Sequence, residues 1–182
     1  MRDAGKEAVR DAAKDDMRDD RKIGVYPGSF DPFTVGHLDV LRHASLLFDR
    51  VYVSILRNSS KQPVFSEAER AELIRRVVED SRLANVEVLT FDGLTVEHAR
   101  ELKASYLIRG LRAITDFEYE FSMDALNRHL APEIQTVYFM ARPEHSFLSS
   151  SKVREIGSLG GSIGGLVPAC IEKMITERLA QQ

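Results

Sequence analysis

Short apolar runs alternate with amphipathic stretches along most of this chain, and this alternation is the feature that most constrains its fold. Apolar runs of strand type occupy residues 23–26, 51–56, 86–89, 106–108 and 136–140. Between them, apolar residues recur at helical spacing. Strand–helix–strand units join parallel strands by right-handed crossovers, and their helices cover both faces of the sheet. The sequence therefore predicts an α/β fold, with a doubly wound, parallel, five-stranded sheet and helices on both faces.

Capping signals indicate where the helices begin. Ser66 and Glu69 have the spacing of a capping box, in which each side chain accepts a hydrogen bond from the other residue's backbone N–H. They predict a helix that ends near Glu79. Further helix starts are expected at Thr95, at Asp116, at Ser149 or Ser150, and at Pro168.

The two ends of the chain differ from its middle. Residues 1–21 interleave acidic and basic side chains with little apolar surface, and we expect a charged, flexible extension there. Residues 22–182 are expected to form one domain. The glycine-rich stretch 157–165 is interpreted as a mobile connection before the last helix. Cys170 is the single cysteine, so an internal disulfide is excluded, and we expect its side chain to be buried in that helix.

The overall charge and hydropathy exclude several classes of partner. The formal net charge is −3, from 25 Lys and Arg against 28 Asp and Glu, whereas nucleic-acid-binding proteins usually carry a basic excess. No apolar run approaches the roughly 18 residues that a membrane-spanning helix needs. The first residues do not resemble a signal peptide. We therefore expect a cytoplasmic protein that binds neither nucleic acid nor membrane.

The segment that follows the first predicted strand, residues 27–37, has the parts of an anion-binding loop. It matches neither of the two common glycine-rich phosphate-binding patterns. Gly28 and Gly36 allow a ligand to approach the backbone closely, and Gly36 and His37 fall at a predicted helix start, where unpaired N–H groups favour an anion. His37 is thus placed to donate a hydrogen bond to a phosphoryl oxygen. The histidines without such a context are expected to be ordinary surface or core residues: His43, His98 and His129.

Three motifs resemble those of one enzyme family. Thr34-Val35-Gly36-His37 resembles the (H/T)-x-G-H signature of the nucleotidyltransferase superfamily, and the run 26–37 resembles the bacterial phosphopantetheine adenylyltransferases. Residues 108–113 (IRGLRA) with 116–120 (DFEYE) are similar to the most distinctive segment of that family. Residues 146–154 (SFLSSSKVR) are similar to the superfamily's I-S-S-[ST]-x-x-[RK] motif. The resemblance covers about residues 22–180 and implies a Rossmann-like nucleotide-binding fold, in agreement with the alternating pattern.

The resemblance also implies a reaction, the transfer of an adenylyl group from ATP to 4′-phosphopantetheine with release of pyrophosphate. The attacking phosphate oxygen is already an anion, so the reaction needs positioning and electrostatic stabilisation rather than a general base. By matching motifs, the residues expected to be catalytic are His37, Lys61 and Arg109. Those expected to bind the acceptor are Ser29, Lys61, Thr95 and Arg109. Those expected to bind ATP are Ser29, Phe30, His37, Gly110, Leu111, Arg112, Glu120, His145, Ser146, Phe147, Leu148, Ser149, Ser150 and Ser151.

Further properties are implied by the resemblance alone. They are Mg²⁺ bound with ATP, a homohexamer, and coenzyme A as a feedback ligand. The sequence shows no carboxylate cage, so the metal is expected to be held mainly by phosphates and water. His145 stands where the family usually has Tyr or Trp. Two alternatives stay open: another small-molecule nucleotidyltransferase, acting on nicotinamide mononucleotide or glycerol phosphate, and a non-catalytic nucleotide-binding module.

Overall fold

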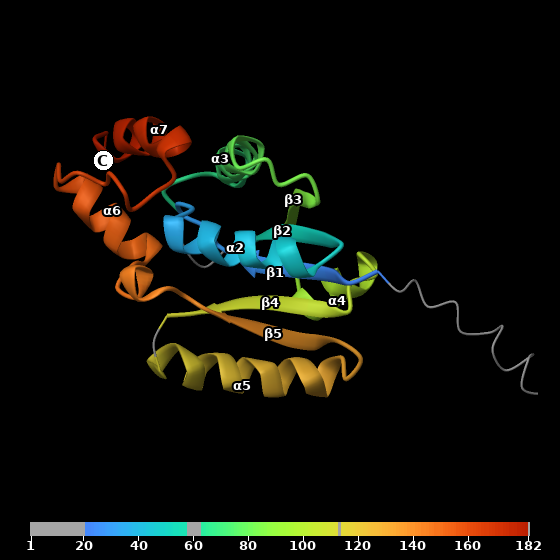
Figure 1. Ribbon diagram of the computed structural model, residues 1–182. Coiled ribbons are helices and arrows are strands. Elements are labelled where there is room, and N and C mark those ends of the chain that lie inside the picture. The colour runs from blue at the N-terminus through green and yellow to red at the C-terminus, as the bar shows by residue number, and fades with distance from the viewer. Residues whose placement is uncertain (1–20, 58–62, 113, 182) are drawn as a thin grey trace, which may run out of the picture.

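One parallel sheet organises the molecule. The structure, a computed structural model, describes residues 21–57, 63–112 and 114–181. Within them, five strands lie in the order β3–β2–β1–β4–β5, all parallel (Figure 1). This confirms the predicted doubly wound sheet. Residues 1–20 of the predicted extension lie outside the described residues. The strands are β1 (Ile23–Gly28), β2 (Arg50–Leu56), β3 (Val86–Phe91), β4 (Tyr106–Leu111) and β5 (Gln135–Met140).

Helices connect the strands and cover both faces of the sheet. Helices α2, α3, α6 and α7 lie on one side, and α5 lies on the other (Figure 1). The predicted capping box at Ser66 and Glu69 is present at the start of α3. The helices are α2 (Val35–Leu47), α3 (Glu67–Asp80), α4 (Thr95–Glu101), α5 (Ile114–Leu130), α6 (Ser150–Ser158) and α7 (Ala169–Leu179), with a short 3₁₀ helix, η1 (Pro143–His145).

The core has two parts because neighbouring strand residues point to opposite faces. Tyr26 and Ile108 pack in the larger part, with residues of α2, α3, α6 and α7. Val25 and Leu107 pack in the smaller part, with residues of α4 and the segment after α5. The sheet is therefore buried on both sides, as expected for parallel strands. Among the described residues, no helix is long and apolar enough to cross a membrane.

Strands β1, β3 and β4 each continue two or three residues beyond their predicted ends. β1 continues through Pro27 to Gly28, although this dipeptide was interpreted as the end of the strand. β4 continues to Leu111, so Arg109 and Gly110 belong to the strand that was predicted to end at residue 108. In both places the continuation is stabilised by a neighbour on one side only: β2 pairs with β1 up to Gly28, and β5 pairs with β4 up to Leu111.

Helix boundaries and burial near the C-terminus also differ from the predictions. Gly157 lies inside α6 and packs against Leu179, where a Cβ would come within 2.4 Å of the leucine Cδ1. Cys170 is exposed, so the prediction of a buried thiol was wrong. α7 buries the face that carries Ile171 and Ile175, and the residue before Ile171 points away from that face.

Two further predicted helix starts are shifted. α5 begins at Ile114, so Asp116 lies in its first turn rather than at its N-cap position. α4 begins at Thr95, and its N-cap residue, Leu94, makes no side-chain capping hydrogen bond. The Thr95 side chain therefore does not cap this helix, although its predicted position at the helix start is confirmed.

Candidate active site

The sheet opens between β1 and β4, the point where the strand order reverses. β1 pairs with β2 along its whole length but with β4 only at Gly24 and Val25, which face Tyr106 and Leu107. Pro27, two residues after Val25, has no backbone N–H and so cannot donate a hydrogen bond that would extend the β1–β4 ladder. Crevices at such switch points, beyond the carboxyl ends of the strands, are where ligands bind in this class of sheet.

Two adjoining cavities occupy this opening. The smaller, of about 250 Å³, is lined by Thr95 at the start of α4 and by inward-facing residues of α5 and β5. The larger, of about 460 Å³, is lined by the start of α2, the end of β4 and the start of α6. A wider groove of about 670 Å³ between α3 and β3 contains none of the predicted site residues. The two adjoining cavities share the following residues as a common wall: Pro27, Gly28, Ser29, Arg109, Tyr119 and Glu120.

His37 enters the larger cavity from the first turn of α2. Its position is fixed by a reciprocal capping box with Thr34: the Thr34 N–H donates to His37 Nδ1 at 3.0 Å, and the His37 N–H donates to Thr34 Oγ1 at 3.3 Å. A backbone N–H can only donate, so Nδ1 must accept. The neutral imidazole therefore carries its proton on Nε2. Burial, followed by the charge of Arg112, lowers the pKa of His37 to about 4.

The loop between β1 and α2 packs aromatic rings around this histidine. The rings of Phe30 and Phe33 lie 5.2 and 5.4 Å from the imidazole, centroid to centroid. Phe30 has a left-handed backbone, with φ of 48°, and its ring covers Gly28 so closely that a Cβ there would come within 2.7 Å of Phe30 Cζ. Gly28 is thus required by this packing. The apolar enclosure explains why His37 stays uncharged near neutral pH.

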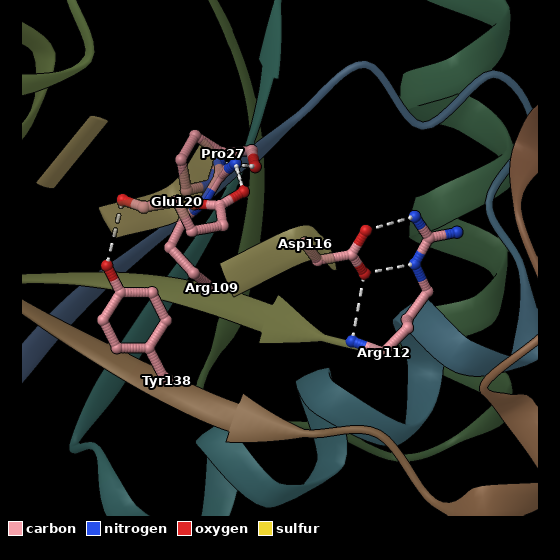
Figure 2. A network of polar contacts seen from close by, with 6 residues as sticks. All are labelled: Pro27, Arg109, Arg112, Asp116, Glu120 and Tyr138. Carbon is pink, nitrogen blue, oxygen red and sulfur yellow. Dashed lines mark hydrogen bonds and ion pairs between the residues drawn. The ribbon is translucent and has the colours of Figure 1, made fainter. Parts of the chain in front are cut away.

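Arg109 lies on the common wall and is held by a carboxylate. Its Nε donates to Glu120 Oε2 at 2.7 Å and its Nη2 donates to Glu120 Oε1, while Nη1 donates to the Pro27 carbonyl at 3.3 Å (Figure 2). Tyr138 of β5 donates its hydroxyl to the backbone carbonyl of Glu120 at 3.3 Å. Burial alone would lower the pKa of Arg109, but the hydrogen bonds and charge of Glu120 more than offset this, and the pKa is raised.

Arg112 directly follows the last residue of β4 and is held in a similar way. Its Nε and Nη2 donate to the Asp116 carboxylate at 3.0 and 3.2 Å, as Figure 2 shows from close by. Its Nη1 donates to the Leu148 carbonyl at 2.6 Å, which ties the end of β4 to the segment before α6. Arg112 thus brings a positive charge to the larger cavity in a fixed orientation.

The start of α6 supplies serine hydroxyls and backbone N–H groups to the same cavity. Ser149 is the N-cap and accepts from the Lys152 N–H at 3.2 Å, which confirms a predicted helix start. Ser150 donates its hydroxyl to the Pro32 carbonyl at 2.8 Å and so joins α6 to the loop after β1. Ser151, the next residue of α6, also lines the larger cavity. The first turn of a helix attracts anions through its unpaired N–H groups and dipole.

Most of the predicted site residues come together. Of the residues expected to bind the acceptor, Ser29, Thr95 and Arg109 line the smaller cavity. Leu111 is buried in the core. His145, Ser146 and Phe147 are not among the residues that line either cavity. His145 is nevertheless close to the start of α2, because a Cβ on Gly36 would lie 3.7 Å from the His145 Cβ. Lys61 lies outside the described residues. The larger cavity is lined by Ser29, Phe30, His37, Gly110, Arg112, Glu120, Leu148, Ser149, Ser150 and Ser151.

Several residues that support the site were not predicted. The buried Asp31 carboxylate accepts from the N–H groups of Val64 and Phe65 at 3.1 and 3.0 Å, and Arg154 donates to the Asp31 carbonyl. Arg70 of α3 donates to the Ser29 carbonyl at 2.6 Å. Arg154 occupies the basic position of the third motif, which was the available signal. Asp31 and Arg70 carry no local pattern that marks them, because their partners lie more than 30 residues away.

Comparison with solved structures supports the fold. A Vibrio parahaemolyticus protein assigned provisionally as a nicotinate-nucleotide adenylyltransferase superposes with a TM-score of 0.67, at 19% identity, over 89% of this chain and 96% of that chain. A bifunctional NMN adenylyltransferase/ADP ribose pyrophosphatase from Francisella tularensis gives a TM-score of 0.65, at 16% identity, over 89% of this chain and 50% of that chain. At these identities the likeness concerns the fold alone.

Comparison with curated sequences identifies the family. Residues 25–156 match the cytidylyltransferase-like family model. The chain is 52% identical over 157 residues to a phosphopantetheine adenylyltransferase from Lachnoclostridium phytofermentans, covering 86% of this chain and 95% of that protein. It is 55% identical over 146 residues to one from Rubrobacter xylanophilus, covering 80% and 88%. With the site geometry described above, these matches show that the chain belongs to the cytidylyltransferase-like nucleotidyltransferases and, among them, to the phosphopantetheine adenylyltransferase family.

Proposed function

We propose that this protein transfers an adenylyl group from ATP to 4′-phosphopantetheine, forming dephospho-coenzyme A and pyrophosphate. The observation that carries this proposal is the common wall of the two cavities, with Arg109 on it and His37 beside it. A reaction between two polyanionic substrates needs two adjoining compartments and a junction that neutralises charge. Homologues at about 50% identity carry the name of this activity.

The chemistry at the junction is a displacement at phosphorus. An oxygen of the acceptor phosphate forms a bond to the α-phosphorus of ATP, and the bond from that phosphorus to the oxygen bridging the α- and β-phosphates breaks. Pyrophosphate leaves with the bonding electrons. No proton has to be removed from the nucleophile, so catalysis consists of alignment and charge stabilisation.

Within this scheme, His37 is the residue that stabilises the transition state. Its Nε2–H is a fixed hydrogen-bond donor, because Nδ1 is occupied by the Thr34 N–H. The low pKa keeps the ring neutral, so it donates without taking up or releasing a proton. A preorganised donor aimed at developing negative charge contributes more in an enclosed site than in water.

The two substrates are assigned to the two cavities. The acceptor would occupy the smaller cavity and place its phosphate near Ser29 and Arg109, with its arm along Thr95. ATP would occupy the larger cavity, with its phosphates toward Arg112 and the serines at the start of α6. Lys61 is proposed to contribute a further positive charge from the segment after β2, on the strength of the family resemblance.

Mg²⁺ is proposed to enter with ATP, bound to its phosphates. Among residues 21–57, 63–112 and 114–181, no group of three or more His, Cys, Asp or Glu side chains is arranged to hold a metal ion. The carboxylates that line the larger cavity, Asp116 and Glu120, are engaged with arginines. The described side chains thus do not form a metal cage, and no step in the scheme above is assigned to the metal.

The proposals on assembly, location and regulation draw on the exposed surface of α5 and on the family resemblance. Helix α5 exposes large apolar side chains, including Phe117, Phe121 and Leu126, and this supports a homo-oligomer, for which the family resemblance suggests a hexamer. A cytoplasmic location and feedback by coenzyme A follow from the family resemblance alone. Light scattering of the purified protein at several concentrations would measure the oligomeric state.

An acceptor panel tests the proposed function. Pyrophosphate release from ATP would be measured with 4′-phosphopantetheine, nicotinamide mononucleotide and glycerol 3-phosphate in parallel. We expect release with phosphopantetheine alone, and loss of that release in the His37→Ala variant. The matched control is His129→Ala, which removes an exposed histidine of α5 away from both cavities. Release with another acceptor, or none with phosphopantetheine, would refute the proposal.

A further inference from the structure

Three buried side-chain atoms have no hydrogen-bond partner within the part of the chain that the structure describes. They are Asp39 Oδ2, Arg70 Nε and Asp124 Oδ1. Buried polar groups in folded proteins nearly always have a partner, so each exception needs an explanation. Of the three residues, Asp124 alone lines a cavity of the candidate site, the smaller one. An unpaired carboxylate oxygen beside a cavity points to a hydrogen-bond donor on the molecule that the cavity binds.

Asp124 lies on the buried face of α5, and its carboxylate is paired on one side. The residue is 9% exposed. Arg128, one turn later on the helix, donates from Nε to Asp124 Oδ2 at 2.7 Å, and the Arg128 side chain is 56% exposed. An ionised carboxylate offers about four acceptor positions on its two oxygens. Arg128 occupies one of them, so the Asp124 carboxylate keeps capacity for a further donor.

The neighbouring hydroxyl on β5 does not supply that donor. Tyr138 lines the same cavity. Burial, followed by the negative charge of Asp124, raises the pKa of the Tyr138 phenol, which shows that this charge lies near the ring. The Tyr138 hydroxyl nevertheless donates to the Glu120 backbone carbonyl, at 3.3 Å (Figure 2). The Asp124 carboxylate is therefore available to a donor that a ligand brings.

The position of Asp124 along α5 decides which part of the acceptor it meets. Glu120, which binds Arg109, lies four residues earlier on α5, or about 6 Å along a helix axis. The acceptor phosphate is assigned to Arg109, and a carboxylate would repel that phosphate. Beyond its phosphate, 4′-phosphopantetheine has an uncharged arm with a hydroxyl and a pair of amide N–H groups. A carboxylate one helical turn from the phosphate site suits this arm.

We propose that Asp124 is a specificity-determining residue for the acceptor, and that its carboxylate accepts a hydrogen bond from a hydroxyl or an amide N–H of the acceptor's arm. The inference rests on the proposed function, since it assumes that this arm occupies the smaller cavity. Binding of the arm completes the pairing of a carboxylate that is partly unpaired in the free protein. An acceptor without the donor leaves that oxygen unpaired and is disfavoured for this reason.

This role predicts opposite effects of one substitution on stability and on binding. Asp124→Ala removes a buried, partly unpaired charge, so its urea midpoint should equal or exceed that of wild type. The same change should raise the acceptor KM by about 10–10²-fold, the usual effect of losing a hydrogen bond to a charged group. The ATP Kd should stay within about twofold, because Asp124 does not line the larger cavity. A carboxylate that only supports the fold would lower the midpoint when it is removed.

The experiment combines this variant with acceptors that each lack one donor. Pyrophosphate release from ATP is measured for wild type and Asp124→Ala with 4′-phosphopantetheine, with its analogue that lacks the hydroxyl, and with analogues methylated at either amide nitrogen. In the wild type, the analogue without the recognised donor should have a kcat/KM lower by about 10–10²-fold. In Asp124→Ala that penalty should shrink by about tenfold, which identifies the donor.

Two further variants make the comparison specific. The matched control is Glu118→Ala, which removes an exposed carboxylate of the same helix that lines neither cavity, and it should leave every ratio unchanged. Asp124→Asn removes the charge but keeps the shape and one acceptor oxygen, so its acceptor KM should rise less than that of Asp124→Ala. An equal or larger rise would contradict a hydrogen bond accepted by this side chain.

The outcomes separate this inference from the proposed function. If the wild type transfers to 4′-phosphopantetheine but Asp124→Ala leaves the penalty of every analogue unchanged, the inference alone fails. A urea midpoint of Asp124→Ala clearly below that of wild type would also overturn it. If the wild type transfers nothing, the proposed function fails, and calorimetry with 4′-phosphopantetheine decides the inference. Binding that Asp124→Ala weakens supports it, and the absence of such binding overturns it.

Discussion

Replacing His37 by alanine tests whether the capped histidine acts as a neutral donor. The change removes the Nε2–H, and with it one preorganised hydrogen bond to the developing charge. Loss of one such donor lowers kcat by about 10²–10³-fold, which corresponds to roughly 2.7–4.1 kcal/mol of barrier. The ATP Kd should change little, since Arg112 and the start of α6 line the same cavity and remain in place.

The same substitution has a structural cost that must be separated from the chemical one. His37→Ala also removes the acceptor for the Thr34 N–H, in a residue that is 2% exposed. Disturbing a helix N-cap costs about 0.5–2 kcal/mol. For a chain of this size that corresponds to a fall in Tm of roughly 1–8 °C. The variant should therefore be measurably less stable but still folded at 25 °C.

Thr34→Ala is the matched control. It removes the capping oxygen and should cost a similar amount of stability, but it keeps the backbone N–H that holds Nδ1 and so keeps the Nε2–H tautomer. Its kcat should stay within about tenfold of wild type, because no donor to the transition state is lost. Steady-state pyrophosphate release and thermal unfolding would be measured on all three proteins. The reasoning is refuted if His37→Ala keeps kcat within tenfold, or if Thr34→Ala loses as much activity as His37→Ala.

Four other measurements address the imidazole ring, the helix packing, the loop after β1 and the N-terminal extension. NMR titration of His37 should show the Nε2–H tautomer and a midpoint near pH 4. Because the pKa of His37 is lower in the folded than in the unfolded state, its contribution to stability is lost as the pH falls from about 6.5 through 4. A midpoint at about 6.5 would contradict the assignment. Gly157→Ala should destabilise by about 1–3 kcal/mol in urea, because its Cβ meets Leu179; an unchanged midpoint would show that the helices can separate at no cost. Asp31→Ala should destabilise by about 1–3 kcal/mol or more, because it leaves buried N–H groups unpaired, whereas deletion of residues 1–21 should leave activity near normal.

The architecture followed from the sequence because periodicity is a local property. Alternating apolar runs and helical spacing fix a parallel sheet without any knowledge of long-range contacts. The ends of β1 and β4 were harder to predict, because Pro27 and Gly110 are local signals that disfavour strand. In the folded chain each segment keeps one neighbouring strand, and this tertiary pairing outweighs the local preference.

The site was predictable where a motif carries it and unpredictable where distant segments meet. His37 could be placed because the helix start, the cap and the neighbouring glycine all lie within four residues. The pairing of Arg109 with Glu120 depends on how α5 lies across β4, which no local pattern encodes. The burial tendency of free cysteine failed at Cys170 because the face of a helix decides exposure, not the residue type alone.

The register of the sheet places Arg109 where the pairing of β1 with β4 ends. β1 and β4 face each other with an offset of 82 residues at Gly24–Tyr106 and Val25–Leu107, and the same offset sets Pro27 opposite Arg109. Where the next rungs of the ladder would stand, a guanidinium reaches across to the proline carbonyl instead. A cation thus bridges the strands where the backbone stops doing so. A substitution that extended the hydrogen-bonded pairing of β1 and β4 would narrow the opening and would also displace the Arg109 guanidinium. The width of the opening and the positive charge within it are therefore coupled.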